Sequence, residues 1–395
     1  MKKLVALILS LAMLLMLTAC GEDALEMAEI IKVNSTQSCD TYVPGEDYQQ
    51  NWNTWGSNEA KLFTMSEQGC YFYSFYGSRL LYFFDYSSGS TVPLCNLPNC
   101  AHNSESCNAY LDFVPSYLQY YDGNLYAVCH DGEDSDVTLY RISADGIKIG
   151  CVGTIFRLTG AESVVCLIHR GYAYATVYTN DFSERSTEVY RLSLSGGDEA
   201  ECIRSFDPCF GGACYLRAYG NYVYIEQQYY ADGEGNGYNG NIYRYNIHTG
   251  TTELVLENVR RDFVVDSEYI YYDNDTQVVA YELITGEKTV LLDLGYPVFL
   301  TYDGIHLYCD NDCGLWISQY SGEEAIDDPR MIIVINASSQ KPVASISVEE
   351  NSGSQCDVVG IAQSDLITCV NYKTFYRSDL NAAMSGMELV FEQLN

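Results

Sequence analysis

The sequence predicts an all-β protein, a seven-bladed β-propeller of four-stranded antiparallel blades, and three observations lead to this prediction. One strand-and-turn phrase recurs seven times between about residue 61 and the C-terminus of the 395-residue chain. Each copy spans roughly 40 to 50 residues and gives four short runs rich in Tyr, Val, Ile and Leu, bounded by turn formers. No part of this region has the sustained 3.6-residue periodicity of a helix. One such sheet would leave apolar faces exposed, so we expect the copies to stack around an axis.

Residues 1–19 predict a lipoprotein signal peptide. Lys2 and Lys3 give a basic start, and Leu4 to Leu17 form an apolar core that is short for a membrane span. The following Leu17-Thr18-Ala19-Cys20-Gly21 resembles the lipobox of bacterial lipoproteins. This resemblance implies cleavage before Cys20 and diacylglycerol on its sulfur. The protein would then be lipid-anchored at the extracytoplasmic face of the cell membrane.

Residues 20–60 predict a flexible tether between the lipid and the propeller, which would occupy residues 61–395. This segment has no strand repeat and is rich in Glu, Asp, Asn, Gln and Ser. The whole chain carries 53 acidic and 21 basic residues, a net charge of -32. Such a surface repels nucleic acid, so we expect no nucleic-acid partner.

The fifth copy of the phrase is the clearest, and its four predicted strands are Phe263–Asp266, Tyr269–Tyr272, Val278–Leu283 and Thr289–Asp293. The second strand recurs in the other copies as Cys70–Tyr73, Asn124–Ala127, Tyr172–Ala175, Tyr222–Ile225, His306–Cys309 and Asp365–Thr368. The third strand repeats a Tyr-Arg pair at Arg141, Arg191, Arg244 and Arg377. Turns such as Asp145-Gly146 and Thr249-Gly250 follow, where Gly adopts a positive φ without steric cost.

The long insertions of the repeat fall between strands two and three, or between one copy and the next. In an antiparallel blade both positions emerge on one face, which we predict to be the working surface. The insertions are Cys95–Pro115, His130–Val137, Thr179–Ser186, Asp207–Ala213, Tyr230–Gly240 and Asp310–Arg330. The acidic and aromatic residues expected to bind there are Asp131, Asp134, Tyr230, Asp232, Glu234, Tyr238, Trp316 and Tyr320.

The densest chemistry on the predicted face is a run of three cysteines and one histidine: Cys95, Cys100, His102 and Cys107. Three thiolates and an imidazole suit tetrahedral zinc, but the one-residue gap between Cys100 and His102 is tight for two ligands of one ion. Export favours oxidation, so disulfides are the preferred interpretation, with a metal site or free thiols as alternatives. If Cys20 of the 16 cysteines carries lipid, an odd number remains.

Residues Asp232 to Gly237 resemble the first half of a calcium-binding loop, with oxygen donors at alternate positions and Gly at the sixth. The twelfth position is Tyr243, where such a loop needs a bidentate Glu. A polar hairpin loop is therefore the preferred interpretation, and zinc and calcium stay the two cofactors that the sequence would allow.

Catalytic patterns are mostly absent from the sequence, so we assign no catalytic residues. It contains no Gly-x-Ser-x-Gly elbow, His-Glu-x-x-His helix, P-loop or dinucleotide fingerprint. The sequence thus favours a membrane-anchored binding or scaffold module whose loop face holds an envelope protein or a glycan. A carbohydrate-active enzyme, a glycosidase or polysaccharide lyase on the same propeller, is the alternative.

The Tyr-Arg and Thr-Gly phrases make residues 61–395 similar to the TolB-like and quinoprotein-like propeller lipoproteins of Gram-positive bacteria, many of unknown function. The resemblance implies a fold and not an activity. The chain has three tryptophans, Trp52, Trp55 and Trp316, and lacks the tryptophan-docking motifs of quinoprotein blades. We therefore expect no quinone cofactor.

Overall fold

The computed structural model describes residues 42–44, 46–48, 60–74, 79–132, 134–146, 149–159, 162–179, 183–197, 199–259, 262–311, 330–348, 356–370 and 374–394. The predicted signal peptide, Cys20 and most of the predicted tether lie outside the described residues. So do Trp316 and Tyr320 of the predicted binding face.

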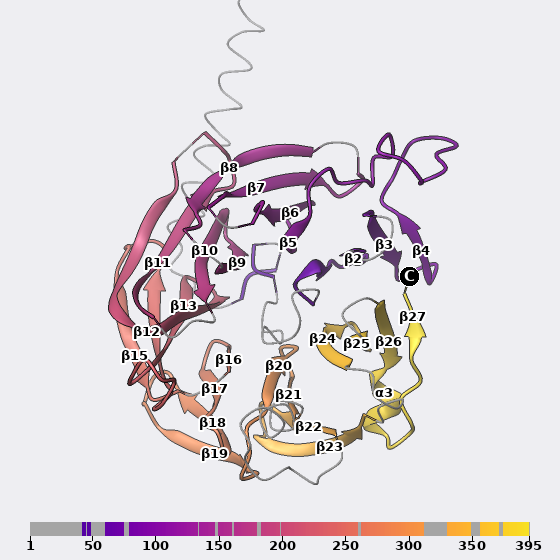
Figure 1. Cartoon of the computed structure of the whole chain (residues 1–395). Coiled ribbons are helices and arrows are strands. Elements are labelled where there is room, and N and C mark those ends of the chain that lie inside the picture. Colours follow the sequence, from indigo (N-terminus) through magenta and orange to yellow (C-terminus); the bar gives the residue numbers. More distant parts are fainter. Residues whose placement is uncertain are drawn as a thin grey trace, which may run out of the picture.

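The described residues form six antiparallel sheets, each made of strands that follow one another in sequence (Figure 1). A 3-10 turn, η1 (Ala60–Leu62), precedes them. Five sheets have four strands. The first is β1 (Phe63–Met65), β2 (Gly69–Tyr73), β3 (Leu81–Asp85) and β4 (Ser90–Pro93), and the next is β5 (Pro115–Tyr121), β6 (Asn124–Cys129), β7 (Asp136–Ser143) and β8 (Ile149–Arg157). The other three are β16 (Phe263–Val265), β17 (Tyr269–Asp273), β18 (Gln277–Glu282) and β19 (Lys288–Asp293); β20 (Phe299–Tyr302), β21 (His306–Asp310), β22 (Met331–Asn336) and β23 (Lys341–Ser347); and β24 (Cys356–Ala362), β25 (Asp365–Val370), β26 (Thr374–Asp379) and β27 (Glu392–Gln393).

The remaining sheet has seven strands: β9 (Glu162–His169), β10 (Tyr172–Thr179), β11 (Glu184–Ser193), β12 (Glu201–Tyr219), β13 (Tyr222–Tyr230), β14 (Asn239–Asn246) and β15 (Thr252–Glu257). The first half of β12 pairs with β11, and its second half pairs with β13. Two four-stranded units therefore share one long strand.

This shared strand corrects one prediction, because Asp207–Ala213 is not an inserted loop. Phe210 pairs with Glu184 on one side and with Tyr230 on the other, and the pairing shifts between Phe210 and Ala213. Gly211 has φ 58° there, and a Cβ on Gly212 would come within 2.7 Å of the Thr187 hydroxyl. The two glycines thus let the backbone pass from one unit to the next as a bulged strand.

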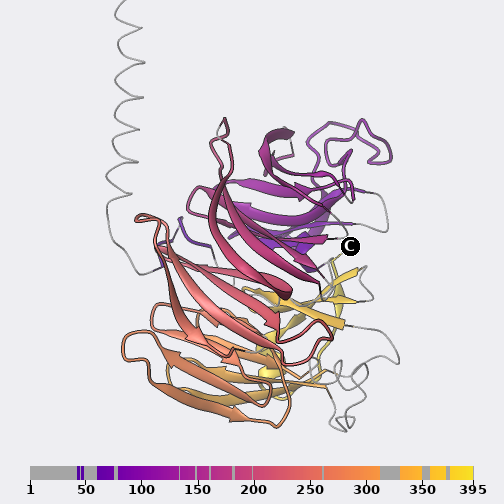
Figure 2. The same cartoon turned by 60° about the vertical axis from the view of Figure 1, so that its left-hand side comes forward.

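The sheets stand around a common centre in a β-propeller-like ring, with the first strand of each sheet innermost (Figure 1). The twist of each sheet is visible in Figure 2. Buried apolar side chains between neighbouring sheets hold the ring together. In one such cluster Phe63, Phe72 and Phe84 of the first sheet pack with Ile367 and Phe375 of the last. The first and last sheets are therefore joined by side-chain packing, since each has four strands of its own.

The antiparallel order gives the ring two faces with different connections. The turn face carries the turns between the first and second strands and between the third and fourth. The loop face carries the loops between the second and third strands and the links from one sheet to the next. The link between β4 and β5 and the loops β6–β7 and β13–β14 all belong to the loop face, as the repeat predicts.

A short helix, α3 (Leu380–Met384), lies between β26 and β27 of the last sheet. The sequence did not predict it. Asp379 caps it by accepting a hydrogen bond from the backbone N–H of Ala382. Leu380 and Ala383 are buried against the last two sheets. Within the described part of the chain, no helix combines the length and apolar character that crossing a membrane requires.

Candidate functional site

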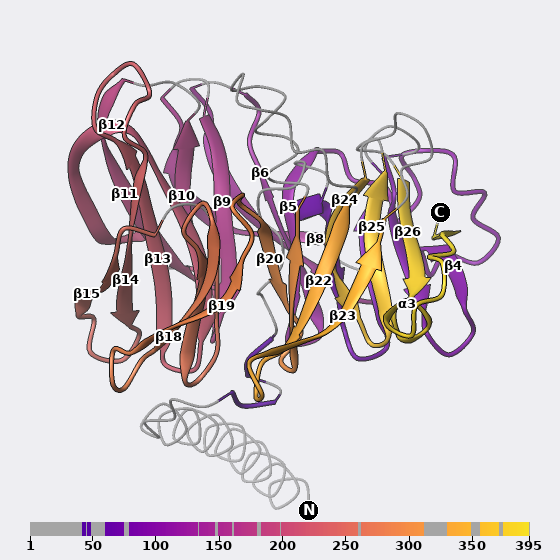
Figure 3. The ribbon, with the colours of Figure 1, turned by 90° about the horizontal axis from the view of Figure 1, so that it is seen from below.

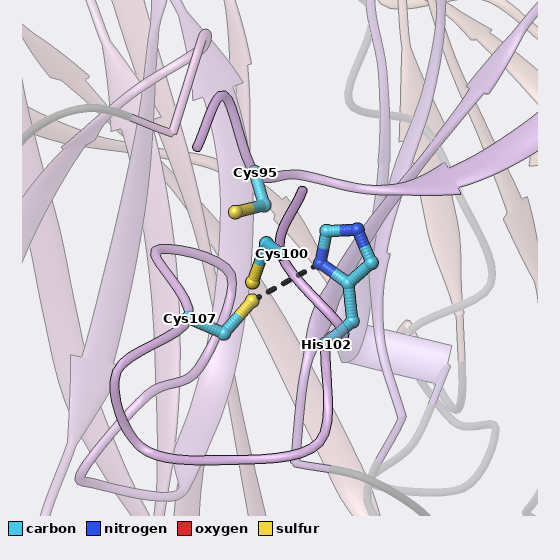
Figure 4. Close-up of side chains that lie close together, drawn as sticks. All are labelled: Cys95, Cys100, His102 and Cys107. Atoms are coloured by element: carbon cyan, nitrogen blue, oxygen red, sulfur yellow. Dashed lines mark hydrogen bonds between the residues drawn. The ribbon is translucent and has the colours of Figure 1, made fainter. Parts of the chain in front are cut away.

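The structure brings together the four side chains of the predicted Cys/His run. Cys95, Cys100, His102 and Cys107 lie in the link between β4 and β5, and their sulfur and imidazole atoms all lie within 4.8 Å of one another (Figure 4). His102 Nδ1 is 3.3 Å from Cys107 Sγ. Here His102 adopts φ 52°, an uncommon left-handed conformation for a residue other than glycine.

The link that carries these four side chains is anchored in the core. Cys107 is 3% exposed and packs with buried Ala109 and Leu111. The backbone N–H of Leu81 in β3 donates to the carbonyl of Ala109 at 2.8 Å. The side chain of Asn108 donates to Asn96 across the link. These contacts hold both ends of the run, so the donor atoms are positioned before any ligand arrives.

Two of the thiols differ in acidity. Partial burial acts to raise the pKa of the Cys95 thiol, but the backbone N–H groups of Leu97 and Asn108 outweigh it, and the pKa lies below its usual value. Burial raises the pKa of Cys107 to about 11. Cys95 is therefore the thiol of this pair that ionises first. The three thiols are free in the structure.

The predicted acidic and aromatic residues of the loop face separate into two loops. Asp131 and Asp134 are exposed in the β6–β7 loop. Tyr230, Asp232, Glu234 and Tyr238 lie at the β13–β14 hairpin, where the Tyr230 and Tyr238 ring centroids are 5.1 Å apart. The structure does not place these residues in one described cleft, so the binding role of this face stays a prediction.

Asp232 organises its own loop. Its carboxylate accepts hydrogen bonds from the backbone N–H groups of Glu234 and Asn236 and from the Asn236 side chain, at 2.9 to 3.0 Å. These bonds lower the pKa of Asp232. The arrangement favours the polar hairpin over a calcium loop, because the carboxylate oxygens already have partners within the loop.

A segment of the predicted tether lies on the turn face near the centre of the ring, and Figure 3 shows it as the indigo chain beneath the sheets. The Tyr48 ring packs on Tyr121 with centroids 5.2 Å apart, and its hydroxyl accepts the backbone N–H of Asp122. Asp47 is 3% exposed and makes a bidentate pair with the Arg170 guanidinium at 2.6 and 2.8 Å. We call the described residues 42–44 and 46–48 the strap.

Two adjoining clefts flank the strap on the turn face. The first, of about 730 Å³, lies between the β16–β17 and β20–β21 turns. The second, of about 600 Å³, extends from the β20–β21 turn to the β1–β2 and β5–β6 turns. Tyr42, Tyr302 and Asp303 line both. Each volume lies within the range of about 300 to 1,000 Å³ that is typical of ligand pockets.

The cleft walls are aromatic and acidic. The first cleft is lined by five tyrosines and three carboxylates: Tyr42, Tyr219, Tyr269, Tyr271, Tyr302, Asp266, Glu268 and Asp303. The second adds Asp47, Glu67 and Asp122. Neither set of described lining residues contains Lys, Arg or His. Behind the walls, Arg170 pairs with Asp47 and His306 lies 3.6 Å from Asp303. The walls themselves carry no basic residue, so the clefts have a negative potential.

Asp266 shows how the turns shape the first cleft. One oxygen accepts the backbone N–H groups of Glu268 and Tyr269, and the other accepts the hydroxyls of Tyr271 and Tyr302 at 3.3 and 3.2 Å. Burial, and after it the Asp266 charge, raises the pKa of Tyr271. The tyrosines thus stay protonated, and their rings are held in fixed positions along the wall.

Sequence reasoning did not find these clefts. Their walls come from turns far apart in the chain and from the strap, so no local motif marks them. The sequence contained one indication of the first cleft. Asp266-Ser-Glu-Tyr269 and Asp303-Gly-Ile-His306 are turns that begin with Asp at the same place in neighbouring repeats. In both turns the Asp side chain accepts two backbone N–H groups.

The comparisons with known proteins concern the fold. No protein-family model and no curated protein matches the chain. Among solved structures, a prolyl endopeptidase aligns with a TM-score of 0.53 and 11% identity over 83% of this chain and 47% of its own. Oligopeptidase B from Leishmania major aligns with a TM-score of 0.50 and 10% identity over 95% of this chain and 52% of its own. The chain thus spans about half the length of either peptidase, and at these identities the likeness shows the fold alone.

TolB from Acinetobacter baumannii aligns with a TM-score of 0.37 and 13% identity over 80% of this chain and 76% of its own. The all-β ring therefore rests on the sheets, their order and the packing between them.

Proposed function

We propose that this protein is a lipid-anchored, extracytoplasmic binding module that holds a basic segment of a partner protein in the clefts of the turn face. Diacylglycerol on Cys20 would attach it to the cell membrane, and residues 61–395 would form a propeller of seven blades. The order of residues around Cys20 supports the anchor, and the described strands support the blade count.

The two units that share β12 support the proposed blade count. Counting them separately gives seven four-stranded units, one for each copy of the sequence phrase. A ring of this kind is a rigid frame for the turns and loops at its two faces.

The strap supports an orientation for the module. The Asp47–Arg170 pair and the Tyr48 contacts fix the end of the tether to the turn face. With lipid on Cys20, the turn face would therefore be the side from which the tether leaves toward the membrane. The link with the Cys/His cluster would lie on the opposite face.

One observation carries the choice of ligand: the clefts combine tyrosine rings with six carboxylates and have no basic residue on their described walls. Lysine and arginine side chains are attracted both to carboxylates and to the faces of tyrosine rings. Glu67 and Glu268 are exposed, so they can meet a ligand without losing the turn contacts that hold Asp266. A basic peptide segment fits this surface better than a neutral glycan, which does not need the charge.

The test is a binding titration of the full chain in detergent with peptides that alternate Lys or Arg with neutral residues. Acidic and neutral peptides of the same length and a neutral glycan array are tested in parallel. We expect the basic peptides to bind and the affinity to fall as salt is raised. Glu268→Gln and Glu67→Gln should each weaken binding about two- to five-fold, which corresponds to an exposed ion pair.

Glu234→Gln is the matched control, because it removes the same charge from the loop face. If it weakens binding and the two cleft variants do not, the site lies on the loop face as the sequence predicted. If only glycans bind, the ligand class is wrong. Release of the protein into the medium by Cys20→Ser would support the anchor, whereas retention on the membrane would contradict it.

A further inference from the structure

We propose that Cys95, Cys100, His102 and Cys107 form a closed tetrahedral zinc site that fixes the link between β4 and β5. The proposal does not depend on the proposed function, because the cluster lies on the loop face and not in the clefts. It reverses the preference for disulfides that the sequence alone suggested.

The spacing of the donor atoms fits one tetrahedral ion. Zinc lies about 2.3 Å from thiolate sulfur and about 2.0 Å from imidazole nitrogen, which sets neighbouring donors roughly 3.5 to 3.8 Å apart. The four donor atoms lie within 4.8 Å of one another, and His102 Nδ1 is 3.3 Å from Cys107 Sγ. Small shifts of side chains alone would complete the tetrahedron. The structure also answers the objection that Cys100 and His102 are too close in sequence, since the donor atoms of both lie in the same group within 4.8 Å.

The composition of the cluster favours a metal over disulfides. Three thiols can form one disulfide at most, which would leave the third thiol and the imidazole without a role. Zinc uses all four groups, and four protein ligands with no open position are typical of a structural site. Soft thiolates favour zinc over magnesium and calcium, which prefer oxygen.

The cluster lies against the core of the first sheet. Cys107 is buried in that core, and Cys95 and Cys100 pack against it. Since Cys107 and Ala109 are buried in the core beside β3, an ion bound here would tie the outer link to the first sheet.

The test is metal analysis of the full chain purified in detergent, anaerobically and without chelators. We expect about one zinc per chain, all three thiols reduced, and stoichiometric zinc release when a mercurial reagent titrates the thiols. This measurement needs no variant, so it stands even if ligand variants fail to fold. Replacement of zinc by cobalt(II) should give the visible absorption of a tetrahedral thiolate site.

The zinc content of variants then distinguishes cysteines that bind the metal from cysteines that do not. Cys100→Ser should lower the zinc content to below about a tenth per chain, whereas Cys151→Ser, at an exposed cysteine of β8, should leave it unchanged. His102→Ala should weaken retention of zinc against a chelator, and His102→Cys should restore it by forming a four-thiolate site. Protein without metal, or a disulfide between any two of the three cysteines in the anaerobic preparation, would overturn the proposal.

Discussion

Arginines in two regions of the ring make ion pairs of very different kinds. The arginines of the repeated Tyr-Arg phrase lie on the outer strands, where Arg191 and Arg244 pair with glutamates of the next strand and stack over tyrosines of the previous one. The interior pairs are Arg217–Asp262, Arg330–Asp310 and Arg170–Asp47, and each occurs once. In the outer pairs the glutamates are 60% exposed, whereas both partners of Arg217–Asp262 are at most 2% exposed.

The exposed outer pairs are a general feature of the repeated blade, whereas the buried interior pairs are specific to this ring. An exposed pair contributes about 0 to 1 kcal/mol to the free energy of unfolding, so each outer arginine alone adds little to stability. A fully buried charge that loses its partner costs about 3 to 5 kcal/mol, so loss of one partner of Arg217–Asp262 would be strongly destabilising. Arg217 lies on β12 and Asp262 directly precedes β16, and the Asp262 carboxylate also accepts the backbone N–H of Leu300. This one group therefore connects three neighbouring units.

The largest expected effect is that of Arg217→Met, which leaves the Asp262 carboxylate without its cation. We expect the free energy of unfolding to fall by about 3 to 5 kcal/mol. The measurement is urea unfolding at pH 7.5, because burial raises the pKa of Asp262 to about 6 against the opposing effect of Arg217. Arg244→Met, the same change in an outer pair, is the control. Equal losses in the two variants would show that burial does not distinguish the two regions.

A second effect comes from Glu226, which is fully buried beside the Arg217–Asp262 pair. Burial raises the pKa of Glu226 to about 8, although the Gln228 side chain donates a hydrogen bond that opposes the shift. The folded state thus holds a proton that the unfolded state releases near pH 4.5. The resulting stability is complete below this pH and is lost as pH rises through about 8.

Between pH 6.5 and 8 the free energy of unfolding should therefore fall with rising pH, by at most about 1.4 kcal/mol per unit for one proton. Glu226→Gln, which resembles the protonated acid, should remove this slope. Buried His169 does not interfere in this window, since its pKa is lowered to about 4 and its effect lies between that value and 6.5. An unchanged slope in the variant would mean that Glu226 is ionised in the folded protein.

The strap should give a smaller and more local effect. Asp47→Asn keeps the shape of the side chain but removes the charge that faces Arg170, and we expect a loss of about 1.5 to 3 kcal/mol, as for hydrogen bonds to charged groups. Hydrogen exchange should show faster exchange in residues 42–48 and no change in the strands of the ring. Asp131→Asn on the loop face is the control. If the ring strands exchange faster as well, the strap is part of the core and not a separate attachment.

The same contrast explains how much the sequence could predict. The strands of the fifth copy agree with β16 to β19 within one residue at each end, because each repeats a pattern that seven copies reinforce. The Cys/His cluster was also visible as a dense local run. The shared strand β12, the strap and the clefts were not, because they depend on contacts such as Asp47 with Arg170 that join distant parts of the chain once each.

The smallest expected effect belongs to the outer pairs themselves. Arg191→Gln and Arg244→Gln should each lower the free energy of unfolding by about 0 to 1 kcal/mol, since the glutamate partners stay hydrated when the charge is lost. The two variants should be additive, because each arginine pairs with a different glutamate on a different strand. Urea unfolding of both single variants and the double variant measures this directly. A double variant that loses much more than the sum would mean that the repeated arginines act together, and the outer strands would then share the cooperative character assigned here to the centre.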